Sequence, residues 1–109
     1  MSYNIEVTAF FEKQLKRLSK KFPSLKKEFA LLIVSLKSDP RQGKTIGNNC
    51  FKIRFAIASK GKGKSGGARI ITHVQIIQNK VYLLSIYDKS EQSDIQDKDL
   101  DNWLKVIPK

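Results

Sequence analysis

The sequence contains few residues that bind metals or form disulfides. It has one cysteine, Cys50, and one histidine, His73. A single cysteine cannot form an internal disulfide, and neither residue has partners at metal-ligand spacing, so we expect no metal and no cofactor. The longest apolar run, Phe29 to Val34, is far too short to cross a bilayer, and Met1 to Phe10 does not resemble a secretion signal. These absences predict a cytoplasmic protein that does not act at a membrane.

Acidic residues are absent from a long central stretch of the chain. Residues 40–87 hold no Asp or Glu, and the whole chain carries a net charge of +11. The cations of this stretch are Arg41, Lys44, Lys52, Arg54, Lys60, Lys62, Lys64, Arg69 and Lys80. A small domain with such polarised positive charge favours nucleic acid as partner over an anionic membrane or an acidic protein. A merely solvated cationic surface is the alternative.

The first part of the chain has helical periodicity. At 109 residues, the length fits one domain spanning residues 1–109. A short strand is expected at Tyr3 to Val7, followed by two helices separated by Pro23, the second ending before Pro40. The apolar positions that predict these helices are Phe11, Leu15, Leu18 and Phe22, then Leu25, Phe29, Leu32, Ile33 and Leu36.

From Asn48 onward the apolar period changes to two. This period predicts strands at Cys50 to Ser59, Ala68 to Ile77 and Val81 to Tyr87, paired as sequential hairpins. A short helix is expected after Asp97. The predicted fold class is therefore α+β, with an N-terminal strand and a helical hairpin packed on a small, mainly antiparallel β-sheet and a short C-terminal helix.

Two basic residues are expected on one face of this sheet, and a third at its edge. Alternation from Phe51 to Ala58 places Lys52 and Arg54 together, opposite the apolar residues. Arg69 begins a strand directly after two glycines, where its guanidinium could make a two-pronged phosphate contact or simply be solvated. Alternation places His73 on the face of Arg69, where it could stack on a base or transfer protons, although a lone histidine is more often structural.

The segment Ser59 to Gly67 contains the three lysines Lys60, Lys62 and Lys64. It resembles the end of a phosphate-binding P-loop, but Ala58 occupies the first glycine position and β-branched residues follow instead of a helix. We interpret it as a flexible basic hairpin loop that contacts a nucleic-acid backbone, or else as a solvated hairpin tip.

Tyr87 and Lys89 lie two residues apart at a strand end. Alternation predicts that they share a face with Leu83 and Ser85. Neighbouring cations should lower the pKa of both the phenol and the ammonium group. The alternative is a tyrosine packed at the rim of the sheet and a lysine paired with an adjacent carboxylate. The sequence thus offers a metal-free site of cations and hydroxyls.

Three motifs together resemble a known family. They read Phe-Lys-Ile-Arg-Phe at 51–55, Gly-Gly-Ala-Arg-Ile-Ile at 66–71 and Leu-Leu-Ser-Ile-Tyr-Asp-Lys-Ser-Glu at 83–91. In this order, after two helices, they resemble the RelE/ParE superfamily of toxins from bacterial type II toxin–antitoxin systems, closest to the RelE/HigB-type mRNA interferases. The resemblance runs from about Phe10 to the C-terminus and implies a RelE-like fold.

The resemblance also implies an activity. Such toxins are ribosome-dependent, metal-independent mRNA endonucleases that inhibit translation, cleaving by 2′-hydroxyl attack to leave a 2′,3′-cyclic phosphate. The catalytic residues carried over are Lys52, Arg54, Arg69, Tyr87 and Lys89, and the expected RNA-binding residues are Lys60, Lys62, Lys64 and His73. Ile95 stands where RelE has its C-terminal catalytic tyrosine, so the general base stays open.

The family further implies its partners. These are a cognate antitoxin, the ribosome with its mRNA, and operator DNA only through the antitoxin complex. Two other functions remain as alternatives: a ParE-like DNA gyrase poison, or a non-catalytic RNA-binding or decayed toxin. The basic and aromatic residues favour the nuclease, because ParE-like chains generally lack the full set.

Overall fold

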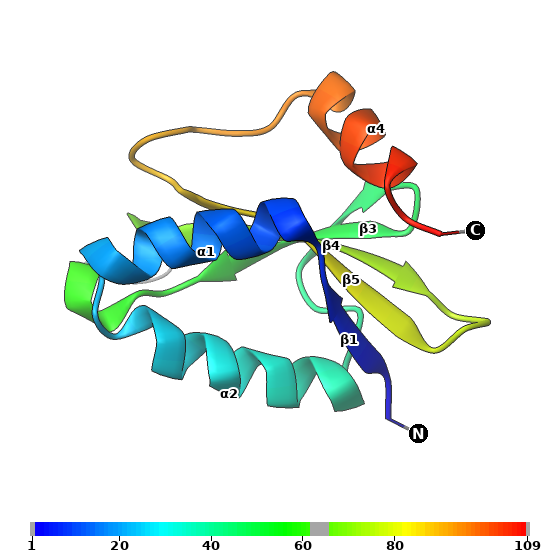
Figure 1. Cartoon of the computed structure of the whole chain (residues 1–109), viewed down its shortest axis with the longest axis horizontal. Helices are drawn as coiled ribbons and strands as arrows, with labels where there is room; N and C mark the ends of the chain where they lie inside the picture. The colour runs from blue at the N-terminus through cyan, green and yellow to red at the C-terminus, as the bar shows by residue number, and fades with distance from the viewer. Residues whose placement is uncertain (1, 62–65, 109) are drawn as a thin grey trace.

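The computed structural model describes residues 2–61 and 66–108. A short strand, β1 (Asn4–Val7), leads into two antiparallel helices, α1 (Ala9–Lys21) and α2 (Leu25–Ser38) (Figure 1). Thr8 begins α1, because its Oγ1 accepts the Phe11 N–H at 3.3 Å. In the described part of the chain, no helix has the length and apolar character that a membrane crossing requires.

Five strands form one mixed sheet in the order β1-β5-β4-β3-β2. The strands that follow the helices are β2 (Lys44–Gly47), β3 (Cys50–Phe55), β4 (Ala68–Gln75) and β5 (Lys80–Asp88). β1 runs parallel to β5, and the other neighbours are antiparallel. The helix α4 (Asp97–Lys105) closes the chain. This arrangement confirms the predicted α+β class.

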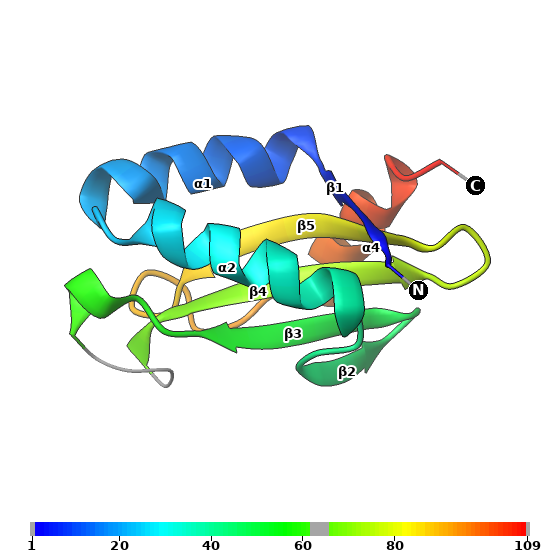
Figure 2. The same ribbon diagram turned by 90° about the horizontal axis from the view of Figure 1, so that it is seen from below.

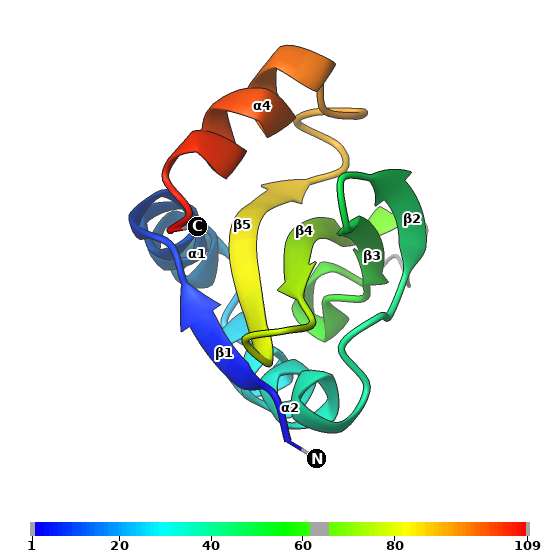
Figure 3. The same cartoon turned by 90° about the vertical axis from the view of Figure 1, so that its right-hand side faces the viewer.

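The apolar side chains form two clusters, one on each face of the sheet. Helices α1 and α2 cover one face and α4 covers part of the other (Figures 1 and 3). Figure 2 shows α1, α2 and the strands from the helical side. The helical side includes Phe11, Leu18, Leu25, Leu36, Ile70, Val81, Leu83 and Ile86, all fully buried. The α4 side includes Cys50, Ile71, Tyr82, Leu84, Tyr87, Leu100 and Ile107.

One predicted strand was too long, and one strand was not predicted. The strand expected at Cys50 to Ser59 ends at Phe55, and Ala58–Lys60 forms a 3-10 turn instead. Strand β2 was not predicted, because its four residues carry no apolar alternation. The turn after β2 holds it in place: Asn48 and Asn49 have φ angles of 55° and 57°, the left-handed pair that tightly joins antiparallel strands.

A β-bulge in β5 changes which residues share a face. Ile71 pairs with Ser85 and Thr72 with Leu83, so Leu84 has no opposite residue. Leu83 therefore packs under the helices, whereas Leu84 lies in the cluster of Tyr87. The expectation that Leu83 shares the face of Tyr87 was wrong, because simple alternation does not continue through a bulge.

Candidate functional site

A cavity of about 510 Å³ lies beside β3 and β4. The residues that line it are Gln42, Gly43, Lys44, Lys52, Ile53, Arg54, Arg69 and Lys89. Five of these eight described residues are cations, and none is acidic. Clefts lined by one sign of charge concentrate ligands of the opposite sign. The cavity is therefore suited to an anion.

The pairing of the strands brings the cations together. Arg54 lies directly opposite Arg69, and Lys44 lies directly opposite Lys52. Residues opposite each other in antiparallel strands have Cβ atoms about 5 Å apart, and like charges at that position destabilise the sheet. Two such pairs side by side reduce stability, a compromise that is typical of functional sites.

A glycine lets the chain before β2 approach the cavity closely. Gly43 has a φ angle of +94°, and a Cβ there would lie 2.4 Å from the carbonyl oxygen of Lys52. No other residue fits that position without moving the backbone of β3. Gly43 thus fixes one wall of the cavity against the strand that carries Lys52 and Arg54.

The two arginines of the cavity differ in exposure. Arg54 is exposed, whereas only 5% of Arg69 is accessible. The Arg69 guanidinium donates a hydrogen bond to the Ala68 carbonyl at 3.1 Å, which helps to orient the side chain. A buried, oriented guanidinium presents its donors in a fixed plane, so Arg69 is suited to positioning an anion and Arg54 to attracting one.

Two of the three lysines of the cavity contact the loop that follows β5. Lys52 Nζ lies 3.2 Å from Asp94 Oδ1, and Lys89 Nζ donates to the Ser93 carbonyl at 2.9 Å. The Ile95 N–H also donates to Asp94 Oδ1 and is the main reason that the pKa of Asp94 lies below its usual value, with Lys52 adding to the effect. Asp94 is therefore ionised at neutral pH.

Tyr87 lies next to Arg69 across β4 and β5 but is nearly inaccessible. Only 3% of its surface is exposed, and its hydroxyl has no hydrogen-bond partner within the described residues. Burial, with a contribution from the charge of Asp94, raises the pKa of Tyr87 to about 12, although Arg69 acts in the opposite direction. The expectation of a lowered pKa was wrong, because desolvation outweighs the neighbouring cations.

His73 shares the face of Arg69, as alternation predicts, but does not line the cavity. It lies opposite Cys50, with Nδ1 3.4 Å from the sulfur, and burial lowers its pKa. Burial also raises the pKa of the Cys50 thiol to about 11. The histidine is thus four residues along β4 from Arg69, beside a thiol that stays protonated at neutral pH.

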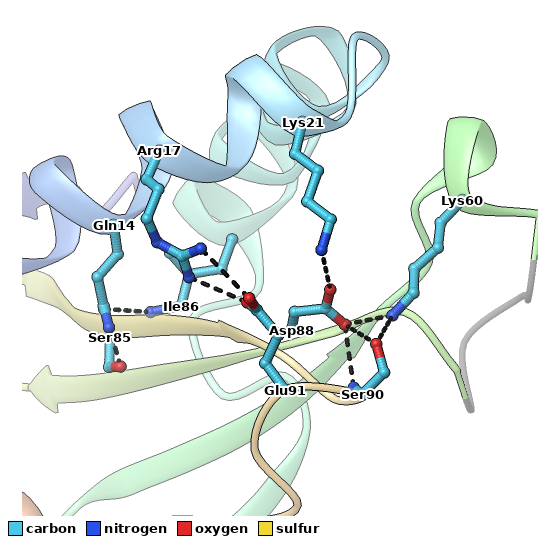
Figure 4. A network of polar contacts seen from close by, with 9 residues as sticks. All are labelled: Gln14, Arg17, Lys21, Lys60, Ser85, Ile86, Asp88, Ser90 and Glu91. Atoms are coloured by element: carbon cyan, nitrogen blue, oxygen red, sulfur yellow. Dashed lines mark hydrogen bonds and ion pairs between the residues drawn. The ribbon is translucent and has the colours of Figure 1, made fainter.

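Lys60 does not project from a loop as the sequence predicted. Its side chain is 8% exposed, and its ammonium forms an ion pair with Asp88 and a 2.9 Å hydrogen bond to Ser90 Oγ (Figure 4). Asp88 is fully buried and also accepts hydrogen bonds from the Ser90 N–H and Oγ–H. Burial by itself would raise the pKa of Asp88, but Lys60 and Ser90 lower it to about 2.

Helix α1 is tied to the same end of β5 (Figure 4). Arg17 forms an ion pair with Glu91 at 3.0 Å, and Lys21 Nζ lies 3.8 Å from Asp88 Oδ2. Gln14 Oε1 accepts hydrogen bonds from the Ser85 hydroxyl at 3.0 Å and the Ile86 N–H at 3.1 Å. These contacts lie beyond the end of β1, where β5 pairs with no other described strand on that side. The helix therefore supports the strand end that carries Tyr87 and Lys89.

The structure groups four of the predicted catalytic residues, Lys52, Arg54, Arg69 and Lys89, around one cavity, with Tyr87 buried beside Arg69. Of the predicted RNA-binding residues, Lys60 and His73 lie elsewhere, and Lys62 and Lys64 fall outside the described residues.

The residues of the site that sequence reasoning missed include Gly43, Lys44 and Asp94. Lys44 belongs to the acid-free interval, but no strand pattern marked its position. Asp94 carries no local signal, because only the folded loop brings it to Lys52.

Solved structures share this fold. A mutant of Escherichia coli toxin RelE in the free state matches with a TM-score of 0.62 at 18% identity, over 99% of this chain and 100% of that chain. The toxin–antitoxin complex RelBE2 from Mycobacterium tuberculosis matches with a TM-score of 0.61 at 15% identity, over 81% of this chain and 99% of that chain. A mutant of E. coli RelE in complex with a RelB antitoxin peptide matches with a TM-score of 0.57 at 17% identity, over 99% and 100%.

A sequence model of one family covers nearly the whole chain. Its description is the RelE toxin of the RelE/RelB toxin–antitoxin system, and it matches residues 7–108. The match includes both helices, the cationic strands and α4. The chain therefore belongs to the RelE family of toxins from toxin–antitoxin systems.

Proposed function

We propose that this toxin is a ribosome-dependent, metal-independent endonuclease that cleaves mRNA and so inhibits translation. The observation that carries the proposal is the cavity in which Lys52, Arg54, Arg69 and Lys89 converge, with no acidic residue among the described residues that line it. A phosphodiester is an anion that such a cavity can accept. Residues 1–109 act in this proposal as a single toxin domain in the cytoplasm.

The main requirement of the reaction is stabilisation of the negative charge that develops on the phosphate oxygens in the transition state. The ribose 2′-hydroxyl gives its proton to solvent as its oxygen bonds to phosphorus, and the bond to the 5′-oxygen breaks. The products are a 2′,3′-cyclic phosphate and a 5′-hydroxyl. Arg69 positions the scissile phosphate, while Lys52 and Arg54 hold the backbone and oppose its growing negative charge. One well-aimed donor of this kind lowers the barrier by about 3 kcal/mol.

Proton transfer assigns different roles to Lys89 and Tyr87. Lys89 has a cationic ammonium that can protonate the leaving 5′-oxygen. Tyr87 has a pKa of about 12 and is therefore protonated at neutral pH, so it does not serve as the general base. Its side chain instead lies beside Arg69, directly across β4 and β5.

The partners follow from the relatives. The E. coli RelE mutant was solved with a RelB antitoxin peptide, and the M. tuberculosis protein with its antitoxin. By this likeness we infer a cognate antitoxin that neutralises the toxin, with an acidic or amphipathic segment that folds on the basic surface. The ribosome and mRNA are the targets, and operator DNA is reached only through the antitoxin complex.

Mapping the ends of a ribosome-bound mRNA tests this proposal. Wild type should cut within the A-site codon and leave a 2′,3′-cyclic end, and Arg69→Ala should reduce the rate by about 100-fold, as the loss of one charge-stabilising donor predicts. Lys26→Ala removes an equal charge from the exposed side of α2 and serves as the control. An intact mRNA, or equal rates for Arg69→Ala and Lys26→Ala, would contradict the nuclease assignment.

The burial of Tyr87 supports a second candidate, an RNA-binding toxin without cleavage. A site with no accessible tyrosine has lost one candidate for proton transfer. Such a protein would hold mRNA in the ribosome without producing new ends. Translation arrest by wild type without cut mRNA would select this candidate, whereas arrest of DNA gyrase would select the ParE-like alternative.

A further inference from the structure

Asp94 places a carboxylate against a cation of the site. Its Oδ1 lies 3.2 Å from Lys52 Nζ, and Lys52 lines the cavity. The side chain of Lys52 is 26% exposed, whereas that of Asp94 is 61% exposed, so the carboxylate approaches the site from the solvent side. The ammonium that the proposed function assigns to the RNA is therefore already engaged by a negative group of the protein.

The preceding residue engages a second cation. The Ser93 carbonyl accepts a hydrogen bond from Lys89 Nζ at 2.9 Å. Two consecutive residues of the loop after β5 thus occupy two of the three lysines that line the cavity, one with a full charge and one with a carbonyl dipole. Each contact uses a donor that a phosphate oxygen would otherwise take.

The loop holds this carboxylate in a defined place. The Ile95 N–H donates to Asp94 Oδ1 at 2.8 Å, and Gln92 Nε2 donates to the Asp94 carbonyl at 2.9 Å. The charge of Lys89 helps to lower the pKa of Asp94, and the charge of Asp94 helps to raise the pKa of Tyr87. Asp94 therefore interacts electrostatically with three predicted catalytic residues, Lys52, Lys89 and Tyr87.

We propose that Asp94 competes with the RNA phosphate for Lys52 and thereby sets the affinity of the cavity for RNA. This inference rests on the proposed function, because it takes the cavity to be the RNA phosphate site. When RNA binds, Lys52 exchanges Asp94 for a phosphate oxygen and Lys89 exchanges the Ser93 carbonyl. Asp94 is not itself a general base in this scheme, because the oxygen that meets Lys52 also accepts the Ile95 N–H and its low pKa makes it a weak base.

The substitution Asp94→Asn tests the competition. Asparagine keeps an oxygen for the Ile95 N–H but removes the charge that holds Lys52. Because a partly exposed ion pair contributes modestly, RNA affinity should rise about two- to five-fold. Binding would then release about one more counterion, so the plot of log K against log salt should steepen by about 0.7.

The matched control is Asp101→Asn, which removes the same charge from an exposed position of α4 outside the cavity lining. The probe is a fluorescent, fully 2′-O-methylated RNA of twelve nucleotides, which cannot be cut by 2′-hydroxyl attack. Its dissociation constant is measured by anisotropy at several salt concentrations. Five proteins are compared in this assay. They are wild type, Asp94→Asn, Asp101→Asn, Lys52→Met and the double variant that combines Lys52→Met with Asp94→Asn.

We expect Asp94→Asn to bind the RNA probe more tightly than Asp101→Asn does. The same substitution should give no gain in affinity in the Lys52→Met background. Equal affinities of the two single variants would overturn the competitor role. Unchanged RNA affinity together with lost mRNA cleavage would also overturn it and identify Asp94 as a participant in the chemistry. A gain in affinity while wild type leaves ribosome-bound mRNA intact would support the competitor role and refute only the nuclease.

Discussion

The ion pair between Asp88 and Lys60 should contribute strongly to the stability of the toxin. Asp88 is fully buried, the Lys60 side chain is 8% exposed, and the pKa of Asp88 falls from 3.8 to about 2. A shift of that size corresponds to about 2 kcal/mol of folding free energy. Asp88→Asn should cost more, about 3 kcal/mol, because it leaves the Lys60 ammonium buried without its counter-charge.

The pH dependence has a definite sign. Because the folded-state pKa of Asp88 is depressed, its contribution is fully present above pH 3.8 and is lost as the pH falls toward 2. Urea unfolding followed by circular dichroism at pH 7, 5, 3 and 2 measures this loss. The free-energy difference between wild type and Asp88→Asn should shrink by about 2 kcal/mol across that range.

A second comparison separates this pair from ordinary surface ion pairs. Arg17 and Glu91 also form an ion pair, but their side chains are 58% and 41% exposed, so Arg17→Ala should cost no more than about 1 kcal/mol. In a double-mutant cycle, Lys60→Met and Asp88→Asn should show coupling of about 2 kcal/mol. Equal costs for Asp88→Asn and Arg17→Ala, or a wild-type pH dependence in Asp88→Asn, would refute the reasoning.

Two further substitutions probe the site. Tyr87→Phe removes a buried hydroxyl without a hydrogen-bond partner in the described chain, so urea unfolding should show stability unchanged or raised by up to about 1 kcal/mol. Because the pKa of about 12 excludes the phenol as general base, mRNA cleavage should persist, and its loss in a stable variant would contradict that exclusion. Gly43→Ala should cost about 2 kcal/mol or more, since its Cβ would strike the Lys52 carbonyl. Gly47→Ala, with a φ angle of +90° and open space around it, should cost only the backbone strain of about 1 kcal/mol, and equal costs would argue against the clash.

Much of the fold could be predicted because its signals are local. Helical spacing indicated α1 and α2, and alternation placed Lys52 and Arg54 on one face of β3. Strand β2 escaped prediction, since a four-residue edge strand needs neither apolar residues nor alternation to pair with β3. The bulge at Leu84 also escaped, because nothing in the residues themselves marks where the register shifts.

Residue type and short-range periodicity were enough to predict most of the helices and strands, the excess of positive charge and the residues able to meet a phosphate. The behaviour of each of these groups depends on the fold. The tertiary structure buried Tyr87 and so raised its pKa, enclosed Lys60 with Asp88, and brought Asp94 to Lys52 across 42 positions of the chain. Desolvation and Coulomb interactions depend on distances through space. Those distances are set only when the strands pair and the loop after β5 contacts Lys52 and Lys89.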